Sequence, residues 1–198
     1  ALAEEYRIPT SPTSWQRVVL LRPTRRRYAR APAAVVPFYN PEAMAGYDLE
    51  TRARGEGLTT QFGRHLVQQG YVVLCGQAFP YNTVPDPGTG ATFDWWRAAA
   101  RVLLAQHPRW TGMGRLIRDT RLATDFLLQQ PEVDPDRLLI IGHSLGGKMA
   151  FYNGCLDRRF RAIVASDFGI GFGFSNWHDP WYLGEQARDP GIAARHHE

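Results

Sequence analysis

The stretch DRLLIIGHSLGGKMAFY, Asp136 to Tyr152, joins an apolar block typical of a buried strand directly to a block typical of a helix. The connection is the five-residue turn Gly142-His143-Ser144-Leu145-Gly146. In so sharp a strand-to-helix turn the central serine adopts a strained backbone conformation. The residues two before and two after it must be small, because the strand and the helix pass close to each other there. The stretch therefore predicts a strand followed at once by a helix that packs against it.

Other apolar blocks of strand length alternate with helix-like segments along the chain. The expected strands are 15–23, 31–37, 71–79, 137–141 and 159–166, and the expected helices are 62–69, 114–130 and 145–156, the last of them amphipathic. Segments 80–96 and 131–137 are rich in Pro, Gly or Asp and are expected to be irregular. No linker or internal repeat divides the chain. The order predicts a single domain, residues 1–198, of the α/β class, with a mostly parallel sheet and helices on both faces.

Composition excludes several classes of protein. The net charge of +4 is carried almost wholly by arginine, since Lys148 is the only lysine. The run RPTRRRYARA, residues 22–31, could contact nucleic acid, an anionic lipid or an acidic substrate, but no nucleic-acid-binding motif accompanies it and a solvated loop is expected. No apolar run approaches the roughly 18 residues of a membrane span, and the first residues lack a signal-peptide pattern, which leaves the compartment open.

The cysteines and histidines show no pattern of a metal site. Cys75 and Cys155 lie in an expected strand and an expected helix without CxxC spacing, and both are expected to be small core residues. No set of His, Cys, Asp and Glu has metal-ligand spacing. We expect neither a metal nor an organic cofactor.

Ser144 is the candidate reactive residue. The turn is expected to push its hydroxyl above the carboxyl end of the sheet, while the following helix directs its free N-terminal amides and the positive end of its dipole at the same point. That arrangement is a nucleophile beside an oxyanion hole. The alternative is a serine that only caps the helix N-terminus.

The segment VDPDRLLIIGHSLGGKMAFYNG, with the later SDFGIGFGFSNWHDPWYLG, resembles α/β-hydrolases and is most similar to bacterial esterases of the dienelactone hydrolase and acetyl xylan esterase-like branch. The likeness extends from about Val18 onward. It implies a serine hydrolase that cleaves a small-molecule or carbohydrate carboxylic ester through an acyl-enzyme at Ser144. The amide of Leu145 would be one oxyanion donor, and the amide of Phe38 or Tyr39 the second.

The same resemblance places the catalytic acid and then the histidine downstream of the serine. Asp167 follows the next expected strand, where some lipases carry their acid, although an Asp that only caps a strand end is the alternative. The usual fold then adds two units of about 30 residues each, but only about 30 residues follow Ser166. We therefore expect an N-terminal portion of a longer hydrolase without its last strands. Its exposed sheet edge should self-associate or bind a completing chain.

The remaining candidates have structural alternatives. His143 is expected to pack under the turn, His178 to pack or to contact substrate, and His196 and His197 end the chain. A set of aromatic residues could form a wall that stacks on an apolar or sugar substrate, or could simply pack one loop on another; it comprises Trp95, Trp96, Phe172, Phe174, Trp177, Trp181 and Tyr182. A non-catalytic hydrolase-like binding domain, or an arginine-mediated surface-binding protein, is the alternative function.

Overall fold

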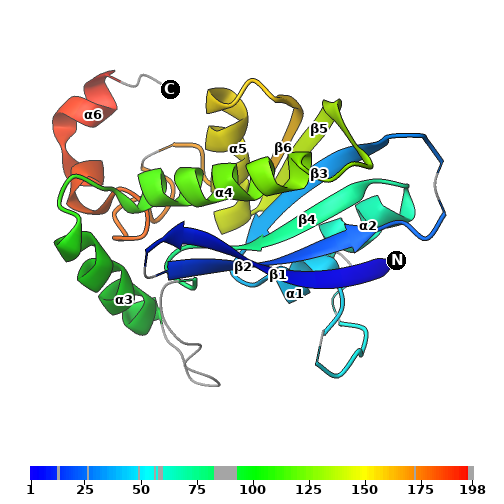
Figure 1. Cartoon of the computed structure of the whole chain (residues 1–198). Helices are drawn as coiled ribbons and strands as arrows, with labels where there is room; N and C mark the ends of the chain where they lie inside the picture. Colours follow the sequence, from blue (N-terminus) through cyan, green and yellow to red (C-terminus); the bar gives the residue numbers. More distant parts are fainter. Residues whose placement is uncertain are drawn as a thin grey trace.

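A computed structural model describes residues 1–12, 14–25, 27–48, 50–55, 57, 60–82, 93–171 and 173–195 of the chain (Figure 1). Six strands form one sheet in the order β1-β2-β4-β3-β5-β6. The strands are β1 (Leu2–Ser11), β2 (Ser14–Arg22), β3 (Ala31–Phe38), β4 (Val72–Gln77), β5 (Val133–His143) and β6 (Phe160–Ser166). The helices are α1 (Pro41–Ala45), α2 (Phe62–Gln68), α3 (Phe93–Gln106), α4 (Gly112–Leu128), α5 (Leu145–Leu156), the 3-10 helix η2 (Gly184–Arg188) and α6 (Pro190–Arg195).

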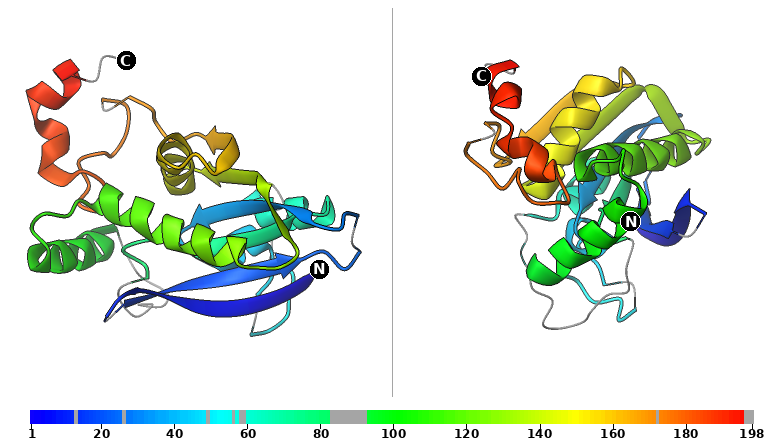
Figure 2. Two further views of the ribbon diagram at one scale, coloured as in Figure 1. Left: turned by 45° about the horizontal axis from the view of Figure 1, so that its top comes forward. Right: turned by 90° about the vertical axis from the view of Figure 1, so that its left-hand side faces the viewer.

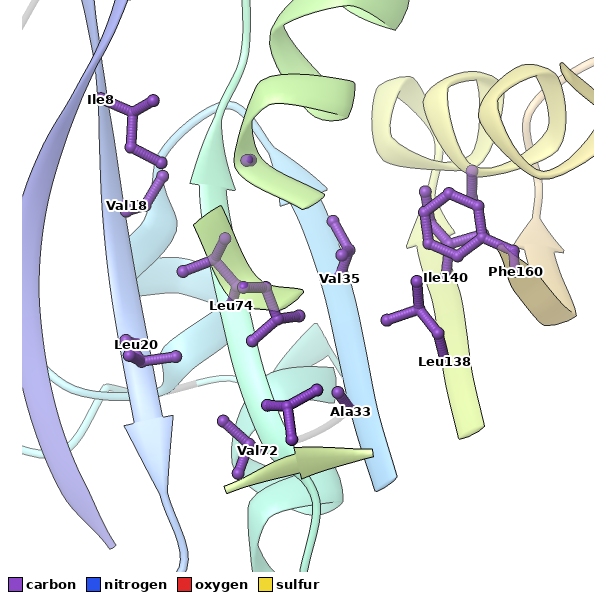
Figure 3. Close-up of a cluster of buried hydrophobic side chains, with 14 residues drawn as sticks. Ile8, Val18, Leu20, Ala33, Val35, Val72, Leu74, Leu138, Ile140 and Phe160 are labelled. Carbon is purple, nitrogen blue, oxygen red and sulfur yellow. The ribbon is translucent and has the colours of Figure 1, made fainter. Parts of the chain in front are cut away.

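The sheet is largely parallel, as the sequence predicts. Strands β4, β3, β5 and β6 are parallel neighbours, whereas β1 and β2 form an antiparallel hairpin that pairs with β4. Both faces of the sheet are covered (Figure 2). Successive residues of β2 show this, because Val18 and Leu20 pack with residues of α4 and α5, whereas Val19 and Leu21 pack with residues of α1 and α2. Figure 3 shows the first of these two clusters, to which Val35, Leu74 and Ile140 also contribute.

The structure differs from the sequence-based expectations in several details. The short helices α1, η2 and α6 were not predicted. Strand β1 was not predicted, because it lies at the edge of the sheet and its apolar residues are interrupted by the charged residues Glu4, Glu5 and Arg7. Part of the segment expected to be irregular, Phe93 to Trp96, is the first turn of α3, another element that was not predicted. Strand β5 begins at Val133, inside the second expected break, and pairs there with Ala31. Cys155 is exposed rather than in the core, whereas Cys75 is buried as expected. Helix α5 is not simply amphipathic, since residues 145–150 are all buried.

None of the helices in the described part of the chain combines the length and the apolarity that a membrane crossing requires. Strand β6 forms the second edge of the sheet and pairs only with β5 among the described strands. Its middle residues are solvent-exposed, including Val164 with 45% of its surface accessible. Unpaired backbone groups next to exposed apolar side chains are a template for association with another strand.

We expect the protein to self-associate in a concentration-dependent manner through β6. Val164→Lys should shift the equilibrium toward monomer, because a lysine on an edge strand opposes edge-to-edge pairing. Analytical ultracentrifugation over a range of concentrations measures this shift. The control is Val102→Lys, which places the same charge at an exposed valine of α3. A chain that is monomeric throughout, or equal effects of the two variants, would contradict the expectation.

Candidate active site around Ser144

Ser144 is the residue between β5 and α5, at the carboxyl end of the parallel strands. Its backbone has φ +54° and ψ −116°, a conformation that L-residues rarely adopt. Two main-chain hydrogen bonds hold it. Its N–H donates to the carbonyl oxygen of Ser166 at 2.9 Å, and its carbonyl accepts from the N–H of Lys148 at 3.1 Å. The hydroxyl makes no capping hydrogen bond to the helix, so the alternative of a simple N-cap serine does not describe it.

The glycines beside Ser144 are required by close backbone contacts. A Cβ atom on Gly142 would overlap the main chain of Gly146, and a Cβ on Gly146 would overlap the carbonyl oxygen of Pro37 at the end of β3. A Cβ on Gly147 would lie 2.7 Å from the carbonyl oxygen of Ser166. The expected close approach of strand and helix is therefore present, and a third element, β3, takes part in it. These contacts keep the serine in its strained conformation.

Tyr39 brings a side chain to Ser144 from the end of β3. Its phenol lies close to Ser144. Burial raises the pKa of Tyr39, and the interaction with the Ser144 side chain lowers it. The phenol is thus neutral at physiological pH and keeps its O–H to donate. The sequence-based prediction for Tyr39 concerned only its main-chain amide. The side-chain contact was missed because it depends on how β3 and β5 pair.

Leu145 fixes the start of α5. Its side chain is fully buried in a cluster with Phe79, Met149 and Trp177. The first amides of a helix have no carbonyl partner within the helix. Anchoring Leu145 therefore holds its main-chain N–H next to the serine that precedes it.

Lys148, one turn further along α5, is buried and fastens the segment after β6 to the helix. Its ammonium group donates to the carbonyl oxygen of Phe168 at 2.7 Å and to the hydroxyl of Ser175 at 2.8 Å. The Nζ atom also lies 4.8 Å from the ring centroids of both Trp177 and Tyr182. Burial lowers the pKa of Lys148 to about 8, and the carboxylates of Asp179 and Asp167 partly oppose this effect.

The expected aromatic wall divides into two groups. Trp177, Trp181 and Tyr182 are buried in the core, which confirms the packing alternative for these three residues. Phe174 is 87% exposed, and Phe172 lies outside the described residues. Trp95 and Trp96 belong to a separate series of neighbouring rings that starts with Tyr39. The ring centroids of Tyr39 and Tyr81 are 4.9 Å apart, those of Tyr81 and Trp96 are 3.6 Å apart, and those of Trp96 and Trp95 are 4.3 Å apart.

The candidate acid and the histidines are not brought together. Asp167 is exposed at the end of β6, with φ +49°, and its carboxylate acts electrostatically on Lys148. The Nδ1 atom of His143 lies 3.4 Å from the hydroxyl of Ser166, and His178 is exposed. His196 and His197 lie outside the described residues. Within the described ranges no histidine hydrogen-bonds to Ser144 or Asp167, and no three His, Cys, Asp or Glu residues are placed to hold a metal ion.

The lowered pKa of Lys148 predicts that stability rises with pH. The folded chain releases this proton near pH 8 and the unfolded chain near 10.5, so the cost of burying the charge is full below pH 8 and is relieved above it. We expect the free energy of unfolding, from urea denaturation, to increase between pH 8 and about 9.5 relative to Lys148→Met. Parallel curves for the two proteins would contradict this. The range stops there because buried Tyr39, Tyr81 and Tyr182 have raised pKa values, which reverse the trend once unfolded tyrosines ionise.

Comparison with known proteins agrees with this architecture. The chain is 29% identical over 106 residues to the proposed hydrolase YtaP of Bacillus subtilis, a match that covers 54% of this chain and 32% of YtaP. A proposed acetyl xylan esterase from Bacteroides fragilis superposes with a TM-score of 0.65 at 20% identity, over 80% of this chain and 42% of that one. A proposed dienelactone hydrolase from Klebsiella pneumoniae gives a TM-score of 0.51 at 18% identity, over 83% and 58%.

The chain thus spans about a third of the curated relative and between about two fifths and three fifths of these two structures. The structural likeness establishes the α/β-hydrolase fold. Residues 53–169, more than half of the sequence, match the sequence pattern of the dienelactone hydrolase family, and the match includes the turn at Ser144. The chain therefore belongs to the dienelactone hydrolase family of α/β-hydrolases.

Proposed function

We propose that this protein is a serine hydrolase of carboxylic esters, with Ser144 as the nucleophile that forms an acyl-enzyme. The observation that carries the proposal is the position of the Ser144 hydroxyl. It lies on a strained turn at the carboxyl end of the parallel strands, makes no capping hydrogen bond to α5, and is close to the Tyr39 phenol. In open α/β sheets, ligands bind at the carboxyl ends of the strands.

The tetrahedral intermediate would place a negative oxygen beside two donors. One is the main-chain N–H of Leu145 at the start of α5, where the helix dipole adds a partial positive charge. The other is the neutral hydroxyl of Tyr39, with the main chain at Phe38 and Tyr39 as a further source. Each donor is expected to contribute about 3 kcal/mol to stabilising the transition state.

Attack by Ser144 also needs a group that accepts its proton. Among the described residues no histidine bonds to Ser144, and Asp167 is the candidate acid. The same observation favours a second candidate function, a non-catalytic domain that retains the turn and binds a ligand there. The reactivity of Ser144 separates the two functions.

For the substrate we propose a small-molecule or carbohydrate ester. The aromatic series Tyr39, Tyr81 and Trp96 starts at Ser144 and could stack on a sugar ring or an apolar group. The structural neighbour from Bacteroides fragilis is itself a proposed acetyl xylan esterase, which agrees with a carbohydrate substrate.

A fluorophosphonate probe should label the protein at Ser144, since such probes react only with activated serines. Ser144→Ala should lose both the label and the hydrolysis of 4-nitrophenyl acetate. Mass spectrometry of the labelled peptide and the absorbance of released nitrophenolate are the measurements. Labelling of the unaltered chain is the critical result, because an unlabelled Ser144 would favour the binding-domain function.

Tyr39→Phe removes the proposed donor and keeps the ring. Loss of one oxyanion donor is expected to lower kcat about 100-fold with little change in KM, because the contact is made mainly in the transition state. Steady-state kinetics on the same ester measures the effect. Tyr71→Phe is the matched control, since Tyr71 is a partly buried tyrosine before β4 at the other end of the sheet. Comparable losses in the two variants would contradict the role of Tyr39.

A further inference from the structure

An arginine-lined hollow lies at the amino end of the parallel strands, opposite to the end that carries Ser144. It has a volume of about 380 Å³ and lies between the segment that follows β2 and the end of α2, with Arg25, Arg27 and Arg54 in its wall. In Figure 1 the segment from β2 to β3 and helix α2 lie at the right-hand end of the molecule, whereas α3 and α6 lie at the left-hand end. The two ends of the parallel strands are about 25 Å apart, which is the length of the eight-residue strand β3.

The charges of these three arginines are not compensated within the described part of the chain. None of them has a carboxylate within ion-pair distance there, and the described lining of the hollow contains no acidic side chain. Other arginines of the protein are paired, for example Arg22 with Glu132 at 2.6 Å and Arg159 with Asp157 at 2.6 Å. Three guanidinium groups around one hollow, none with a carboxylate partner among the described residues, favour an anion of more than one charge.

A second hollow, of about 300 Å³, adjoins the first and shares Arg27 and Gly70 with it. Its wall is mainly apolar and includes Leu2, Tyr28 and Val72. The one acidic side chain described in that wall, Glu132, is neutralised by its ion pair with Arg22. The aliphatic part of Arg27 packs over Gly70, so this residue presents its stem to the boundary between the two hollows.

From this pairing we propose that the two hollows form one binding site for an amphiphilic phosphate monoester. The phosphate would lie among Arg25, Arg27 and Arg54, and its apolar substituent would lie against Tyr28 and Val72. A phosphate monoester carries nearly two negative charges at neutral pH and three acceptor oxygens, which three guanidinium groups can satisfy. The site is independent of Ser144 and of the ester hydrolysis proposed for it.

Isothermal titration calorimetry with 1-naphthyl phosphate tests the site, with inorganic phosphate and 1-naphthol as separate arms. We expect the naphthyl ester to bind at least about tenfold more tightly than either component, because it fills both hollows. The triple variant Arg25→Ala, Arg27→Ala, Arg54→Ala should weaken this binding at least about tenfold. The control Arg101→Ala, Arg109→Ala, Arg158→Ala removes the same charge from exposed positions elsewhere and should leave the affinity unchanged.

Equal losses in the two triple variants, equal affinities for phosphate and the naphthyl ester, or no heat of binding from the unaltered chain would overturn the proposal. The single substitution Arg27→Gln, at the arginine that lines both hollows, provides a milder variant if the triple variant unfolds. Sedimentation with phosphatidylcholine vesicles that contain phosphatidic acid identifies the source of the phosphate. Co-sedimentation that the first triple variant loses supports a lipid headgroup, and binding of the naphthyl ester alone supports a soluble ester.

Discussion

The close approach of three main chains at the turn before α5 is the constraint on which the rest of the structure depends. Gly142 of β5 contacts Gly146 of α5, and Gly146 contacts Pro37 of β3, with no room for a Cβ at either glycine. Strain of the kind seen at Ser144 costs about 1–3 kcal/mol. Burial of Leu145 and Met149, each worth roughly 1.5–3 kcal/mol, more than offsets it. The strained serine is therefore maintained by packing, and its hydroxyl position follows from the sheet.

Much of the fold could be predicted because its strands are buried on both faces. The four residues Val18 to Leu21 are all buried and alternate between two clusters, so an uninterrupted apolar run is the correct signal for such a strand. Strand β1 gives no such signal, since it lies at the sheet edge and is held by pairing with β2 and by the Arg17–Glu5 ion pair. Helix α3 does contain helix-forming residues, Ala98 to Leu104, but the Pro- and Gly-rich stretch before it obscured its start.

The candidate site could be predicted only in part, for a physical reason. The position of Ser144 could be predicted from the local sequence, because the turn requires small residues and two nearby glycines meet that requirement. The Tyr39 contact and the environment of Lys148 are not local, since they depend on elements far apart in the sequence. A single lysine in a helix would ordinarily be expected in solvent. Here the segment after β6 supplies a carbonyl, a hydroxyl and two aromatic rings that replace water around its ammonium group.

The arrangement of charge also differs between the two ends of the parallel strands. Arg25, Arg27 and Arg54, which have no ion pair among the described residues, lie at the opposite end of the parallel strands from Ser144. A strand length of about 25 Å is well beyond the Debye length of about 8 Å at physiological ionic strength. Their field is therefore too weak to stabilise an oxyanion at the turn. Lys148 is much nearer, but its ammonium group is directed at Phe168 and Ser175, and burial favours its neutral form. In the ester hydrolysis that we propose, stabilisation of negative charge at Ser144 would therefore come from oriented neutral groups, the Leu145 amide and the Tyr39 hydroxyl, which the packing around the turn holds in place.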